Sequence, residues 1–125
     1  MKTSNIFFFM KRGYKLVNEC SNGEIRSYNV GGYDDRSFQY GIGIPTYRPK
    51  GFGPMCVLTS KEEGIHIAHY NDNIKLYECE YEPSDDVMLY TPRGSGLTIY
   101  QIRVVFRIFK STELADKVVL TKKIS

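Results

Sequence analysis

The chain has 125 residues, of which 42% are hydrophobic and 25% charged, and it carries a formal net charge of +3. This length predicts a single domain spanning residues 1–125, and the composition excludes a disordered chain, a coiled coil and a collagen-like repeat. Ten Tyr and seven Phe residues favour strands over helices. The sequence therefore predicts an α+β fold, mainly an antiparallel β-sheet with one or two short helices.

The N-terminal region contains one continuous apolar run, Ile6-Phe7-Phe8-Phe9-Met10. Five residues are far fewer than the roughly twenty that span a bilayer as a helix. Lys11 and Arg12 follow the run directly and no small-residue cleavage site is present, so the pattern does not fit a secretory signal. We expect no membrane partner. Residues 6–10 are expected to form either a first strand or an apolar arm that holds a second copy of the chain in a homo-oligomer.

The three cysteines, Cys20, Cys56 and Cys79, are widely spaced and include no Cys-x-x-Cys pair. The spacing therefore excludes a zinc ribbon and a dithiol redox motif. Unpaired thiols are typical of a reducing compartment, so we expect reduced cysteines and a cytoplasmic protein.

Asn22-Gly23 lies between two apolar-alternating segments, residues 14–19 and 24–30, and this arrangement predicts a β-hairpin. The next segment, residues 31–53, is rich in Gly, Tyr, Asp and Pro. It predicts a long irregular loop with one short strand at residues 38–44.

Residues 55–59 predict a short buried strand, followed directly by a helix. Ser60 and Glu63 fit a capping box, in which the Ser60 hydroxyl accepts from the Glu63 amide and the Glu63 carboxylate returns to the Ser60 amide. Gly64 is expected to weaken this helix by about 1 kcal/mol, and the turn-favouring residues 71–73 are expected to end it. Ile65, Ala68 and His69 are expected to share one face of this helix, with Ile67 beside them.

Alternation at residues 74–82 predicts a strand, and a further short strand is expected at 87–91. In the first of these, one face carries Tyr77, Cys79 and Tyr81, and the other carries Leu76, Glu78 and Glu80. Residues 114–120 are predicted as a last strand because of their paired valines, with a short helix as the alternative.

The longest strand is expected at residues 97–109, with one face in the core and the other in water. The core face would carry Tyr100, Ile102, Val104, Phe106 and Ile108. The wet face would carry Gln101, Arg103, Val105 and Arg107.

The order of elements across residues 47–83, together with residues 112–120, resembles a group of small proteins common in phages and prophages. Those proteins open with a hairpin and carry a strand, a Ser/Thr-capped helix and an acidic strand in the middle, as residues 55–82 do here. The resemblance implies a mobile-element gene and a host cytoplasm.

The same unit resembles the second half of ADP-ribosyltransferase-like domains, and Glu78-Cys79-Glu80 spells their Glu-x-Glu. That resemblance would make Glu80 the catalytic carboxylate of an enzyme acting on NAD. The opening strand at residues 13–17, however, lacks the His that one branch of those enzymes places on NAD. The Ser-Thr-Ser strand of the other branch is also missing.

Other candidate catalytic groups are better interpreted as structural. His66 and His69 form His-x-x-His on the predicted helix, but no motif supplies the third and fourth ligands that zinc requires, so we expect no metal. The acidic cluster is expected to be a solvated strand face; it comprises Glu78, Glu80, Glu82, Asp85 and Asp86. No phosphate-binding glycine motif and no nucleophile elbow occur, so we expect no cofactor.

The best binding candidate is the loop around residues 47–53, which interleaves aromatic and cationic side chains between glycines. An aromatic ring can stack on a base while Arg or Lys takes a phosphate. Two arginines on the wet face of the predicted long strand could hold a diphosphate-sized anion beside this loop. The predicted ligand-binding residues are Tyr47, Arg48, Lys50, Phe52, Arg103 and Arg107.

We therefore predict a non-enzymatic binding protein of phage or prophage type. It would capture an anionic, nucleotide-like ligand or a host protein and so block a host process such as defence. A net charge of +3 is too small to favour nucleic acid as the partner. The alternative prediction is the ADP-ribosyltransferase-like enzyme acting on NAD.

Overall fold

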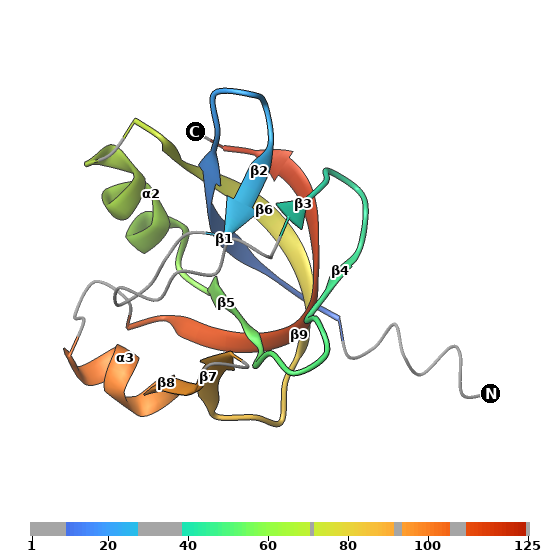
Figure 1. Ribbon diagram of the computed structural model, residues 1–125. Helices are drawn as coiled ribbons and strands as arrows, with labels where there is room; N and C mark the ends of the chain where they lie inside the picture. The colour runs from blue at the N-terminus through green and yellow to red at the C-terminus, as the bar shows by residue number, and fades with distance from the viewer. Residues whose placement is uncertain (1–9, 28–38, 71, 92–93, 106–109, 125) are drawn as a thin grey trace.

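A computed structural model describes residues 10–27, 39–70, 72–91, 94–105 and 110–124 (Figure 1). Strands dominate this part of the chain, and two short helices accompany them, which confirms the predicted α+β class. Neither helix in these ranges is long and apolar enough to cross a membrane. The elements in chain order are β1 (Lys11–Glu19), β2 (Ile25–Ser27), β3 (Gln39–Tyr40), β4 (Thr46–Tyr47), β5 (Met55–Leu58), α2 (Lys61–His69), β6 (Ile74–Pro83), β7 (Met88–Thr91), β8 (Gly94–Thr98), α3 (Ile99–Val105) and β9 (Thr112–Lys123).

The main sheet closes on itself as a small barrel. Strand β1 pairs with β6, and β6 pairs with β9. Strand β9 then pairs with β5, and β5 returns to β1 through the Tyr14–Leu58 pair. Strands β2 and β3 extend the β1 side, β4 extends the β9 side, and β7 and β8 form a separate hairpin. Every one of these strand pairs is antiparallel, so alternate side chains point into the barrel.

The predicted hairpin is confirmed by the pairing of β1 with β2. Gly23 adopts a φ of 88°, which a residue with a side chain rarely does, and its amide donates to the Cys20 carbonyl. The Asn22 side chain accepts from the Glu24 amide at 3.0 Å. The Asn-Gly dipeptide thus supplies both the backbone conformation and the side-chain bond that the turn needs.

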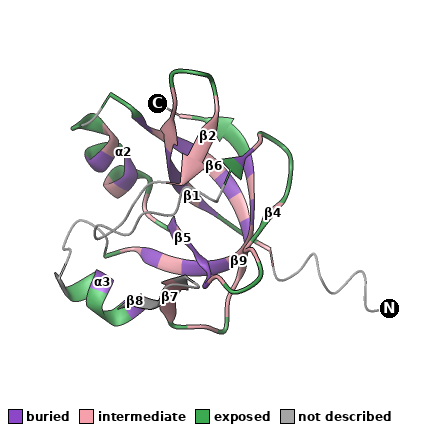
Figure 2. Ribbon diagram, viewed as in Figure 1, coloured by how far each residue is buried: buried purple, intermediate pink, exposed green. Residues whose placement is uncertain are grey.

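Two apolar clusters hold the fold together, one inside the barrel and one between the barrel wall and the helices (Figure 2). The predicted common face of Tyr77, Cys79 and Tyr81 points into the barrel, and each of these residues is buried. Leu76, on the opposite face of β6, is fully buried in the second cluster, beneath α2.

Helix α2 begins as predicted but is tied to the barrel by a different bond. The Ser60 hydroxyl accepts from the Glu63 amide at 3.1 Å. The predicted return bond from Glu63 to the Ser60 amide is wrong. The Glu63 carboxylate instead accepts from the amide and hydroxyl of Ser111, and the Ser60 amide donates to the Ser111 hydroxyl. The capping group thereby joins the start of α2 to the start of β9.

The buried residues of α2 are Gly64 and Ile67, whereas Ile65 is 43% exposed. A Cβ added at Gly64 would lie 2.5 Å from Cδ1 of Leu76. The helix therefore packs so closely on β6 that only glycine fits at this contact. The close approach of α2 to β6, rather than helix propensity, explains why glycine occupies position 64.

Gly64→Ala should destabilise the protein by about 1–3 kcal/mol, the usual range for overpacking a filled core. At an exposed helical position the same change would stabilise by up to about 1 kcal/mol. Urea denaturation measures the difference, with Glu62→Ala on the exposed side of the same turn as the control. A stabilised Gly64→Ala variant would contradict the close packing.

The predicted long strand at residues 97–109 is wrong, because β8 ends at Thr98 and α3 begins at Ile99. The Thr98 amide donates to Oε1 of Gln101 at 2.8 Å, and the Gln101 amide donates to the Thr98 hydroxyl at 3.1 Å. This reciprocal capping box starts a helix in spite of the alternating apolar pattern that follows it.

Because residues 99–105 form a helix, their side chains do not alternate between two faces, and the predicted core face of residues 100–108 is wrong where it can be compared. Ile102 is buried as predicted, but Val104 is 75% exposed and Tyr100 is 62% exposed. Phe106, Arg107 and Ile108 lie outside the described residues. The longest strand is β9, which confirms a strand at residues 114–120, and the strand expected at 87–91 is present as β7.

Candidate binding surface

Arg48 anchors the predicted binding loop to the rest of the protein. Its guanidinium forms an ion pair with Asp86, and its Nε lies 3.5 Å from Oδ1 of Asp116. Its backbone amide donates to the Asp116 carbonyl. The bond to Asp86 raises the pKa of Arg48 above its usual value, with the Asp116 charge acting in the same direction. Arg48 is therefore placed as a structural link between the loop, β9 and the segment after β6.

Arg48→Ala should lower the free energy of unfolding by about 0.5–1 kcal/mol, because two partly exposed carboxylates would lose the cation between them. Thermal unfolding at low and high salt measures the effect, and Lys50→Ala in the same loop is the matched control. An unchanged melting temperature for Arg48→Ala would show that the ion pairs contribute nothing to stability.

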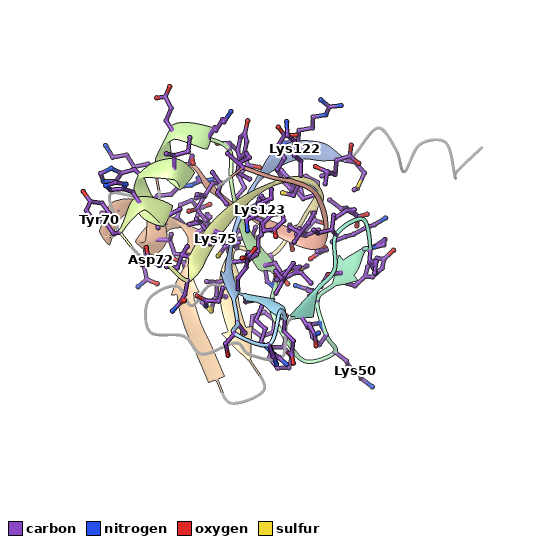
Figure 3. All side chains as sticks on the ribbon, turned by 90° about the horizontal axis from the view of Figure 1, so that it is seen from above. Lys50, Tyr70, Asp72, Lys75, Lys122 and Lys123 are labelled. Carbon is purple, nitrogen blue, oxygen red and sulfur yellow. The ribbon has the colours of Figure 1, made fainter. Side chains whose placement is uncertain are left out.

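Other bonds hold the far end of the loop. The Phe52 amide donates to the Pro49 carbonyl at 3.0 Å, and the Phe52 side chain packs against the barrel core. The Gly53 amide donates to the Tyr90 carbonyl at 2.8 Å. Of the predicted ligand-binding residues, Phe52 is thus half-buried, whereas Lys50 is exposed and projects away from the body (Figure 3).

Three large apolar side chains at the start of the loop, and in the residues just before it, are exposed to solvent. Ile42 is 55% exposed, Ile44 is 63% exposed and Tyr47 is 61% exposed. Ile42 and Tyr47 pair with Leu120 and Lys117 of β9, which places them roughly 10 Å apart along one strand. We call this group, Ile42, Ile44 and Tyr47, the apolar strip.

The apolar strip is fixed in place by the backbone. The Gly43 amide donates to the Leu120 carbonyl at 2.7 Å, and the Ile44 amide donates to the Gly41 carbonyl at 3.2 Å. Lys117 Nζ lies 5.4 Å from the centroid of the Tyr47 ring, which places a cation at one end of the strip. The backbone that carries these three exposed side chains is therefore fixed, and a cation lies beside Tyr47.

Arg103, the described member of the predicted arginine pair, does not lie on a strand. Arg103 belongs to α3, and its Nε and one terminal nitrogen both donate to the Thr112 carbonyl at 3.0 and 2.9 Å. Arg107 lies outside the described residues. The strand position predicted for Arg103 is wrong, because successive side chains of α3 turn by about 100°. Arg103 fastens α3 to the start of β9.

Sequence reasoning missed one buried cation, Lys15, which is 4% exposed. It has the same orientation on β1 as Val17, so its side chain enters the barrel. Its Nζ donates to the Cys56 carbonyl at 2.6 Å and lies 5.6 Å from the centroid of the Tyr40 ring. Local alternation gave no signal for this burial, because apolar side chains occupy both faces of β1 around Lys15, with Leu16 on one face and Val17 on the other.

The remaining candidate groups are dispersed. His66 and His69 are exposed on α2 and each contacts the Tyr70 ring edge to face. Cys20 and Cys56 are half-buried, Cys79 is buried, and burial raises the pKa of Cys79 to about 12. Glu78, Glu80 and Glu82 are half-buried along β6. Within the described ranges, no three His, Cys, Asp or Glu side chains are grouped so that they could hold a metal ion.

Comparison with known proteins adds no relative. No family model matches the sequence, and neither a curated protein nor a solved structure is significantly similar to it.

Proposed function

We propose that the chain is a non-enzymatic binding protein that captures a partner protein through the apolar strip. The supporting observation is that Ile42, Ile44 and Tyr47 are each more than half exposed within six consecutive residues. Exposed apolar groups gathered at one place are typical of protein interaction sites, and Tyr is among the residues that contribute most at interfaces.

The bonds that hold the strip support the same proposal. A surface already ordered by Leu120 and Asp116 of β9 loses little conformational entropy when a partner binds. Lys117 supplies a polar rim next to Tyr47. The resemblance to phage and prophage proteins would make the captured partner a host protein, and capture would block a host process such as defence.

The contacts of the described residues support protein binding at the apolar strip more than they support binding of an anionic, nucleotide-like ligand. Arg48 already faces two carboxylates and Arg103 already binds a backbone carbonyl, so a phosphate would have to compete with these internal bonds. No arrangement among the described residues specifically favours the NAD-dependent enzyme with Glu80 as its carboxylate.

The experiment compares two double variants as bait in a lysate of the cells that naturally make the protein. Ile42→Ser with Ile44→Ser alters the strip, and Tyr100→Ser with Val104→Ser alters equally exposed residues on α3. We expect the unaltered chain and the α3 variant to retain the same partner protein, and the strip variant to lose it at least tenfold. Equal recovery by both variants would overturn the proposal.

A further inference from the structure

Strand β4 forms an open edge of the main sheet. It is the last strand on the β9 side, and no other strand among the described residues pairs with it (Figure 1). Thr46 pairs with Val118 of β9. The Arg48 amide donates to the Asp116 carbonyl at 3.2 Å. Alternate residues of an antiparallel strand bond to the same neighbour, so the amide and carbonyl of Tyr47 point away from β9.

The surroundings of this edge favour pairing with a second copy of the chain. Ile42, Ile44 and Tyr47 are each more than half exposed. An unpaired strand edge with exposed apolar side chains beside it is a typical place for two chains to associate. Two β4 strands related by a twofold axis would place Tyr47 opposite Tyr47, and position 45 of one copy opposite position 49 of the other.

Prolines occupy both positions that this pairing would need next. Positions 45 and 49 lie two residues before and after Tyr47, so their backbone groups face the same open side. Pro45 and Pro49 have no N–H to donate. Pro45 is exposed, and the Pro49 carbonyl already accepts from the Phe52 amide at 3.0 Å. Among positions 45, 47 and 49, only Tyr47 therefore retains a backbone donor.

We propose that Pro45 and Pro49 prevent the β4 strands of two copies from pairing, so that the exposed apolar strip does not lead to self-association. One donor per copy remains where a continuous edge would supply three, and the Tyr47 pair has no bonded neighbour on either side. Proline on an edge strand removes donors without disturbing the bonds to the inner neighbour. Self-association at this edge is independent of the partner protein proposed above.

Analytical ultracentrifugation of full-length variants over a dilution series tests the role of the prolines. Pro45→Ala with Pro49→Ala restores both donors. We expect the average mass of this double variant to rise with concentration above that of the unaltered chain and to approach twice that mass.

Two further substitutions in the double variant separate backbone pairing from side-chain contact. Tyr47→Pro removes the central donor and should abolish the additional association. Tyr47→Ala removes the same aromatic ring but keeps the donor, so the association should remain measurable.

Hydrogen exchange of the Tyr47 amide shows where the two copies meet. In the dilute unaltered chain, its protection should be several times lower than that of the Arg48 amide, which is bonded to Asp116. In the double variant, the Tyr47 amide should become protected as the concentration rises. Residues 6–9 of the predicted oligomer arm lie outside the described residues. Association through that arm would leave the Tyr47 amide unprotected.

Three outcomes would overturn the proposal. The first is a double variant with the same mass as the unaltered chain at every concentration. The second is equal loss of association with Tyr47→Ala and Tyr47→Pro, which would assign the association to side chains. The third is a Tyr47 amide as protected as that of Arg48 in the dilute unaltered chain, because the edge would then already be paired. This last measurement needs no substitution, so it decides the matter even where a variant fails to fold.

Discussion

Leu76→Ala should lower the free energy of unfolding by about 2–5 kcal/mol, the range for removing a fully buried leucine. Leu76 has no exposed surface and lies between β6 and α2, where its Cδ1 approaches Gly64. It belongs to the cluster that joins the barrel to both helices, through Ile67 of α2 and Ile102 of α3. The substitution leaves a cavity that this packed layer cannot readily close.

Urea denaturation, followed by far-ultraviolet circular dichroism, measures the loss for Leu76→Ala. Val104→Ala is the control, because Val104 is 75% exposed and its truncation should change stability by less than about 0.5 kcal/mol. A loss below about 1 kcal/mol for Leu76→Ala would contradict the second apolar layer.

The free energy of unfolding should fall steeply between about pH 9 and pH 12, because the pKa values of Cys79 and Tyr77 are raised in the folded protein. Burial raises the pKa of Cys79 from 9.0 to about 12. Burial also raises the pKa of Tyr77 from 10.0 to about 12, and the bond to Glu19 acts in the same direction. The unfolded chain loses these protons at lower pH than the folded chain does, so each rise in pH favours the unfolded chain until the folded groups also ionise.

The contribution of Cys79 is present in full below about pH 9 and is lost as the pH rises to about 12. A difference of three pKa units corresponds to a loss on the order of 4 kcal/mol. Urea midpoints measured from pH 7 to pH 11.5 test this dependence. Cys79→Ala and Tyr77→Phe should each flatten the alkaline part of the profile, whatever their effect at pH 7. A profile unchanged by Cys79→Ala would contradict a buried thiol.

The sequence predicted those elements that depend on neighbouring residues. The Asn22-Gly23 turn and the Ser60 cap are local bonds, and both are present. The partner of Glu63 was missed because Ser111 lies 48 residues away, at a contact that only the closed barrel creates. The helix at α3 was missed because the prediction followed the alternating apolar pattern and did not consider the Thr98–Gln101 capping box.

The candidate site was only partly predictable because its contacts also join segments that are distant in the sequence. The sequence directed attention to residues 47–52, but it could not show that Arg48 would meet Asp86 and Asp116 from distant segments. Ile42 and Ile44 were expected in a short strand, and their exposure follows from where Leu120 of β9 holds that segment. Exposure and pairing are properties of the closed barrel, which no local pattern encodes.

Hydrogen exchange of the protein with its captured partner bound is the most direct test of the proposed binding surface. If the partner binds at the apolar strip, amides between residues 41 and 48 should exchange at least several times more slowly in the complex. Those of α3, where Tyr100 and Val104 are also exposed, should be unchanged. Slower exchange confined to α3, with residues 41–48 unaffected, would contradict the strip as the binding surface.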